Sequence, residues 1–295
     1  MLVTDIVLLC CFYLILPILY FTLRSEAKPR MNLCLGVTLP YAHLEDDKVG
    51  SIKEEFKRRL RNTLLLLIPW PLFSLLLPGF SLGFSLLMMW LLLAIIVMYL
   101  PYFRAHKELK AYQLRLESEI PEEDAHWHLG MFYRNPKDRR TVVPHRVGMG
   151  TTVNLARPAG KVLMIIALAA ILCIPCICGW VIAEEYTPIT AELSQDALVI
   201  THLTRKEIPL GEITAVTLLP ELPSTRRVAG SGMEHLLKGT FDVDDYGRCT
   251  LHLDPTAPPY LAVCTKETTH LINCSEELYE NLSQRLHQNN SPKGC

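Results

Sequence analysis

Two histidines beside a run of acids are the residues best suited to hold a metal ion. His126 and His128 lie two positions apart, and one alanine separates them from the acidic stretch 122–124. Side chains two apart point away from each other in a helix but share a face in a strand. No third ligand follows at a spacing typical of a zinc site. The sequence therefore favours a cluster at the protein or membrane surface, and we expect no metal or other cofactor.

The glycines Gly148 and Gly150 could form a loop that binds phosphate. They belong to neither a complete G-x-G-x-x-G pattern nor a Walker pattern, so a nucleotide site is not favoured. The chain also lacks the H-E-x-x-H motif of metalloproteases. Asp5 is the only acid within an apolar stretch, whereas transporters commonly carry charges inside their spans. We therefore expect no enzyme, and a small transporter or channel subunit remains an alternative.

A third group, Arg226, Arg227 and Lys238, could contact an anionic ligand or lipid headgroup. Segment 184–295, which contains them, has nine basic and sixteen acidic residues, a net charge of −7. That charge disfavours a strongly anionic partner. Over the whole chain, 29 basic residues balance 30 acidic ones, so no nucleic-acid partner is expected.

Three apolar stretches of the sequence flank the polar segments that contain these residues, and we interpret the stretches as membrane spans. We assign a first span to 1–23, a two-span hairpin to 63–103 and a fourth span to 162–183, because one crossing needs about 20 apolar residues. Pro78 and its neighbouring glycines suit the turn of the hairpin. A cleaved signal peptide is the alternative for the first block, and the prolines of 63–77 leave a kinked or re-entrant segment open.

The basic residues predict the orientation of these spans. Segment 24–62 contains nine Lys and Arg residues and segment 104–161 contains eleven. Both segments are therefore expected in the cytoplasm, the second as a connector between spans. With four crossings, the domain at 184–295 lies outside the cytoplasm. Without a crossing at 63–77, that domain would lie inside.

The connector carries a distinctive motif, "FYRNPKDRRTVVPHRVGMGTTVNLARP" (132–158). Asn-Pro predicts a turn, and the β-branched residues around the glycines predict a hairpin or an extended segment. The stretch resembles a domain of unknown function in uncharacterised membrane proteins of Gram-positive bacteria, next to spans of the kind found in Sdp-immunity-like proteins. "LGVTLP" (35–40) resembles a motif that follows the first span in such proteins. The motif residues, whose roles the resemblance does not supply, are Asn135, Pro136, Asp138, Arg140, Arg146, Gly148, Gly150, Asn154, Arg157 and Pro158.

The C-terminal segment changes to short alternating stretches between turns, which predicts β-strands over 188–274. Ser275 then caps a predicted helix with leucines at helical spacing. The segment resembles a bacterial pleckstrin-homology-like (PH-like) domain, which implies a bent barrel closed by a helix and used for interaction. The residues that carry this resemblance are Ile208, Ile213, Val216, Arg227, Gly230, Gly232, Gly239, Phe241, Gly247, Leu251, Ile272 and Asn273.

Cysteines occur in both parts of the chain. Cys249, Cys264 and Cys274 fall on predicted strands, where neighbouring strands could bring a pair within bonding distance, but buried free thiols are favoured. "CIPCIC" (173–178) lies within the fourth predicted span, where small apolar packing residues are expected.

Together these features predict a helical membrane protein of about four spans with a C-terminal all-β, PH-like domain and one terminal helix. The expected function is that of a non-enzymatic multi-pass protein of the cell membrane: a scaffold, sensor or immunity-like envelope factor. Its expected partners are the lipid bilayer and a protein that binds the C-terminal domain. A lipid-binding adaptor that uses Arg226 and Arg227 is the second alternative.

Overall fold

The computed structural model describes residues 2–116 and 122–290. The chain forms two compact units. One contains 2–77 and 83–177, and the other contains 78–82 together with the chain from residue 178 onward.

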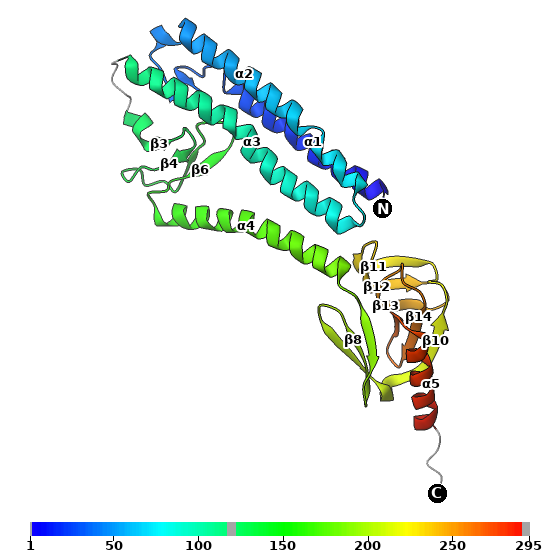
Figure 1. Cartoon of the computed structure of the whole chain (residues 1–295). Helices are drawn as coiled ribbons and strands as arrows, with labels where there is room; N and C mark the ends of the chain where they lie inside the picture. Colours follow the sequence, from blue (N-terminus) through cyan, green and yellow to red (C-terminus); the bar gives the residue numbers. More distant parts are fainter. Residues whose placement is uncertain (1, 117–121, 291–295) are drawn as a thin grey trace. The chain divides into compact units, whose positions relative to one another are not determined.

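Three helices lie side by side in the first unit: α1 (Leu2–Ser25), α2 (Asp47–Leu67) and α3 (Phe80–Arg115) (Figure 1). A single apolar core joins them. On α2 the buried positions recur every three, four or seven residues, so one face of the helix packs inward while the charged face stays exposed. The buried residues of α2 are Val49, Ile52, Phe56, Leu60 and Leu67.

Three helices of the described chain are long and apolar enough to cross a membrane: α1, α3 and α4 (Pro158–Tyr186). They cover the predicted first, third and fourth spans. The segment predicted as the second span, 63–77, begins as the end of α2 and continues as a short 3₁₀ helix, η2 (Trp70–Leu76). Pro69 and Pro71 lie at the break, where proline removes a backbone donor. A fourth crossing therefore remains a prediction.

Outside α2 and α3, the described parts of the two polar segments form short elements. The first has a hairpin of β1 (Leu33–Cys34) and β2 (Val37–Thr38), then η1 (Tyr41–His43). The connector has one turn of 3₁₀ helix and two hairpins, and the second hairpin encloses the glycine motif. These elements are η3 (Glu122–His126), β3 (Trp127–His128), β4 (Phe132–Tyr133), β5 (Val142–Pro144) and β6 (Thr151–Val153).

The second unit is mostly β-structure with a terminal helix, as the alternating sequence predicted. An antiparallel sheet contains β7 (Thr190–Leu193), β8 (Ala197–Thr201) and β9 (Arg205–Pro209). The short η4 (Leu210–Glu212) leads into a six-stranded sheet. Its spatial order is β10 (Ile213–Leu219), β14 (Tyr260–Thr265), β15 (Thr269–Asn273), β13 (Gly247–Leu253), β12 (Leu237–Val243) and β11 (Thr225–Gly232).

One strand pair of this sheet departs from the antiparallel arrangement, because β13 and β15 run parallel. The terminal helix α5 (Glu276–Asn290) buries Leu278 and Leu282 in a core shared with both sheets.

The described cysteines are free thiols. Cys249 on β13 and Cys264 on β14 both lie opposite Thr269 of the intervening strand β15. Two strand spacings separate them by about 10 Å, which is too far for a disulfide.

Candidate functional site

Asn154 is the centre of the connector motif. Its side chain is fully buried. The amide Nδ2 donates to three carbonyl oxygens, those of Asn135 at 2.9 Å, Asp138 at 3.2 Å and Arg140 at 3.3 Å. Its Oδ1 accepts from the backbone N–H groups of Asn135 and Ala156, each at 3.0 Å. One side chain therefore holds the Asn-Pro turn against the strand that precedes α4.

Asp138 and Arg140 form the second part of the motif. The guanidinium of Arg140 donates to the Asp138 carboxylate, with Nη2 to Oδ2 at 2.8 Å, and the Arg140 backbone N–H donates at 2.9 Å. The hydroxyl of Tyr133 donates to the same carboxylate at 3.1 Å. The hydrogen bonds from Arg140 hold the pKa of Asp138 well below its usual range. Asp138 is therefore a fixed anion, and Arg157 Nε binds its carbonyl oxygen at 2.8 Å.

Arg146 and Asp124 form a buried ion pair whose side chains are 9% and 7% exposed. Arg146 also donates to the Thr38 hydroxyl, and Asp124 accepts from that hydroxyl at 2.6 Å and from Gln113 Nε2 at 3.0 Å. Burial acts to raise the pKa of Asp124, but the hydrogen bonds from Thr38, Arg146 and Gln113 outweigh it, and the pKa is lowered. The pair joins the connector to the first polar segment and to α3.

Gly148 connects the motif to the end of α1. Its backbone N–H donates to Glu26 Oε1 at 2.9 Å, with a left-handed φ of +84° that favours glycine. Arg30 bonds the same carboxylate at 3.0 Å. Glu26 is only 4% exposed, and burial raises its pKa. Gly150 also has a positive φ, +102°, and completes the turn between β5 and β6.

Two Leu-Gly turns touch each other beside α3. A Cβ built at Gly130 would lie 3.1 Å from the Gly36 Cα and 2.5 Å from the Tyr102 hydroxyl. Both glycines have positive φ, +68° for Gly130 and +74° for Gly36. The Tyr102 hydroxyl donates to the carbonyl of Leu129 at 3.0 Å. "LGVTLP" and the connector are therefore parts of one packed structure.

The connector also encloses a polar pocket of about 450 Å³. Two cations at its edge already have partners: Arg140 pairs with Asp138, and Lys137 Nζ lies 3.3 Å from Glu122 Oε1. The rim can offer hydrogen bonds to a small polar group or a peptide. The pocket is lined by His126, Trp127, Tyr133, Asn135, Lys137, Asp138, Arg140, Val143 and Pro144.

Of the two histidines first considered as metal ligands, one lines this pocket. His126 lines it, and His128 pairs in register with Phe132 on the β3–β4 hairpin. Across residues 2–116 and 122–290, no group of three or more His, Cys, Asp or Glu side chains is placed to hold a metal ion.

Two of the three basic residues of the C-terminal domain lie apart and have acidic partners. Arg226 pairs with Asp242 at 2.9 Å, and Lys238 pairs with Glu184 at 2.9 Å. Lys238 lies opposite Ser231, five residues along β11 from Arg226, or about 16 Å away. Arg227 is exposed on β11.

Sequence reasoning missed a buried acidic pair, Glu184 and Glu185, at the end of α4. They are 5% and 2% exposed. Glu185 accepts from the backbone N–H of Ser81 at 2.7 Å and from that of Glu234 at 3.0 Å. The signal that could have revealed them is the position of two acids directly after an apolar run.

Comparison with known families supports the motif. A family of unknown function (DUF5808) matches residues 136–161, which include every predicted motif residue except Asn135. No curated protein and no solved structure matches the chain. The motif is thus part of a recurring domain, and the family description assigns it no activity.

Proposed function

We propose that this protein is a non-enzymatic, multi-pass membrane scaffold or sensor of the cell envelope. In this proposal the motif of the connector is a structural element on the cytoplasmic side. The C-terminal domain is PH-like, lies outside the cytoplasm and binds a protein partner.

The observation that carries the proposal is how the motif uses its polar groups. The Asn154 amide bonds backbone atoms on both sides of the turn. Asp138 is held as an anion by Arg140, and Asp124 by Arg146. A general acid or base needs a pKa near the working pH, whereas both of these carboxyl groups have lowered pKa values. These groups are suited to hold the connector in one conformation.

The proposed topology is supported by contacts within the second unit. The Tyr186 hydroxyl donates to the carbonyl of Pro78 at 2.8 Å, and Glu185 accepts from the N–H of Ser81. The start of α3 and the end of α4 are thus close in space, which is expected if these two helices cross the membrane in opposite directions. The basic connector between them then lies in the cytoplasm, and the β-domain lies outside.

An exposed sheet edge supports a protein partner for the β-domain. Strand β11 is the last strand of the six-stranded sheet, and its central residues are exposed. The backbone groups of an edge strand can pair with a strand from another chain. Val228, 47% exposed at the middle of β11, is therefore a proposed contact residue.

A photo-crosslinking amino acid at Val228 tests this role in cells that express the full chain. The expected result is a discrete adduct of higher mass with the crosslinker at Val228. The matched control is the same amino acid at Glu267, which is exposed in the turn between β14 and β15. Equal adducts at both positions, or adducts at neither, would contradict a partner that docks along β11.

A further inference from the structure

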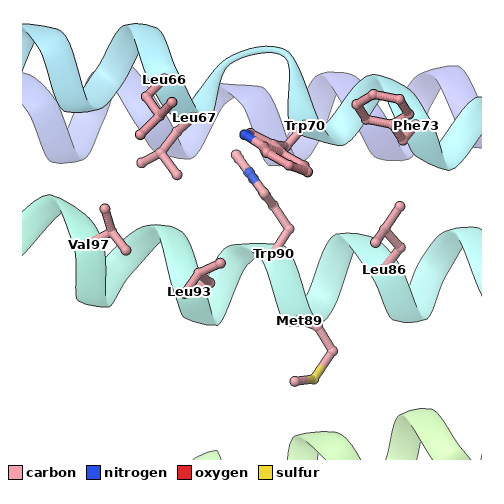
Figure 2. Close-up of a pocket in the computed structure, with 9 residues that line it drawn as sticks. All are labelled: Leu66, Leu67, Trp70, Phe73, Leu86, Met89, Trp90, Leu93 and Val97. Atoms are coloured by element: carbon pink, nitrogen blue, oxygen red, sulfur yellow. The ribbon is translucent and has the colours of Figure 1, made fainter.

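An apolar groove runs between α2–η2 and α3. Figure 2 shows Leu66, Trp70 and Phe73 on one side and Trp90 and Val97 among the residues of α3 on the other. The groove has a volume of about 680 Å³. Its complete lining is Leu66, Leu67, Trp70, Phe73, Leu86, Met89, Trp90, Leu93 and Val97. Inside a bilayer, such a surface accepts hydrocarbon.

A second, smaller cavity lies at the Val97 end of this groove. It has a volume of about 250 Å³, and Val97 lines both cavities. Its other lining residues are Arg59, Asn62, Thr63, Leu100, Pro101 and Arg104. On α2 and α3 these positions continue the same helix faces that line the groove, at steps of three and four residues. The groove therefore leads from a polar, basic mouth to an apolar interior.

The mouth carries positive charge that is not fully neutralised. Arg104 is exposed and has no ion-pair partner among the described residues. Arg59 donates through Nε to Glu55 at 2.6 Å, and its Nη1 lies 3.8 Å from Glu108. A guanidinium has five donors, so Arg59 keeps further donors for a phosphate.

We propose that this groove binds one anionic phospholipid. The headgroup phosphate lies between Arg59 and Arg104, and an acyl chain enters the groove beside Val97. Basic pockets between transmembrane helices are suited to anionic headgroups. The site belongs to the helical unit alone, so it does not depend on the proposed role of the β-domain.

The length of the groove fits the depth of one leaflet. Leu86 and Val97 are eleven residues apart on α3, or about 16 Å at the rise of an α-helix. Half the hydrocarbon core of a bilayer is about 15 Å. Arg104 lies seven residues beyond Val97, about 10 Å further along α3, so the acyl chain passes this polar mouth before it enters the apolar groove.

Native mass spectrometry of the purified full chain in mild detergent tests the site. The probes are phosphatidylglycerol and phosphatidylcholine with identical acyl chains, each added separately. We expect one phosphatidylglycerol per chain to bind well before any phosphatidylcholine. The double variant R59Q/R104Q should weaken phosphatidylglycerol binding about tenfold or more, because each basic residue at a membrane surface contributes about 1 kcal/mol.

A second variant addresses the acyl chain. Leu93 is 56% exposed and lines the groove, so Leu93→Trp should fill it and weaken the binding of the one phosphatidylglycerol without removing charge. Ile96→Trp is its matched control, because Ile96 is 62% exposed on the same helix and does not line the groove. R134Q/R139Q is the control for charge, since it removes two exposed arginines of the connector.

Three outcomes would overturn the proposal. Equal binding of both lipids would exclude an anionic site. An equal loss in R59Q/R104Q and R134Q/R139Q would indicate attraction by net charge alone. If Leu93→Trp breaks a dimer of the chain and leaves phosphatidylglycerol binding unchanged, the groove holds a second copy in place of lipid. Gel filtration identifies a variant that does not fold. If either R59Q/R104Q or Leu93→Trp fails to fold, the remaining one of the two tests the proposal.

Discussion

At the scale of single residues, the hydrogen bonds of Asn154 explain why the motif has an asparagine at this position. An asparagine amide has two donors and one acceptor oxygen, and here both ends bond backbone groups of the turn and of the segment that leads into α4. Aspartate has similar size but lacks the amide donors. The position therefore requires the amide, which explains why asparagine occupies the end of the β5–β6 hairpin.

Replacing Asn154 with alanine should lower the free energy of unfolding by about 3 kcal/mol, because five hydrogen bonds to backbone groups are lost together. Asn154→Asp should be similarly unstable, since a carboxylate would face three carbonyl oxygens. The measurement is thermal unfolding of the purified chain in detergent. Arg139→Ala, at an exposed position in the same turn region, is the control and should leave the midpoint unchanged. A stable Asn154→Ala variant would show that the motif does not hold the connector.

Some of this site could be predicted from the sequence. The Asn-Pro turn and the glycine hairpin follow from local chemistry, and the structure has both. Asp124 was considered only as part of a possible metal cluster, whereas it is the buried partner of Arg146. Local patterns do not reveal such pairs, because Thr38, Gln113, Asp124 and Arg146 come together only when separate segments pack.

At the scale of elements, the two Leu-Gly turns determine how closely the polar segments approach α3. Gly36 and Gly130 pack with no space for a side chain and adopt left-handed conformations. The sequence displays both Leu-Gly pairs, but it does not show that they touch each other.

Gly130→Ala should destabilise the helical unit by about 2 kcal/mol or more, from backbone strain and the contact with Gly36. Gly50→Ala is a sharp comparison. Gly50 lies within α2, and a Cβ there meets nothing within 4 Å, so this change should stabilise the chain by about 0.5–1 kcal/mol. In thermal unfolding, the midpoint should fall for Gly130→Ala and rise for Gly50→Ala. Equal effects would contradict the packing described for Gly130.

The β-domain contains one buried and one half-buried histidine, His252 and His270, that predict a dependence on pH. Burial, with smaller effects of His202 and Lys238, lowers the pKa of His252 to about 4. Burial and Lys206 lower the pKa of His270 to about 4 as well. Both side chains are neutral in the folded domain and would gain protons on unfolding. The domain should therefore be fully stable above pH 6.5 and lose stability as the pH falls from 6.5 towards 4.

Hydrogen exchange of β13 and β15 in the full chain, corrected for intrinsic rates, measures this loss. His252 alone should account for about 2 kcal/mol between pH 7 and pH 4. His252→Gln should flatten the dependence, and His235→Gln, at a partly exposed position, should not. Protection that stays constant down to pH 4 would show that these histidines are not buried as described.

At the scale of the whole molecule, composition predicted the division into apolar helices and a β-rich segment, and the structure has both. Hydropathy alone favours a span at 63–77, but Pro69 and Pro71 already indicated a kinked or re-entrant segment, and the helix does break there. The sequence also did not predict that β13 pairs with β15 in parallel, because close strands separated by turns favour hairpins. Long-range pairing depends on packing between sheets, which alternation alone does not encode.

The side of the membrane on which each part lies is the central claim, and reporter fusions test it most directly. Alkaline phosphatase and green fluorescent protein are fused in turn after Gly79, Arg115 and Cys295 in a bacterial host. The account predicts phosphatase activity after Gly79 and Cys295 and fluorescence after Arg115. Fluorescence after Cys295 would contradict it, because the β-domain would then lie in the cytoplasm.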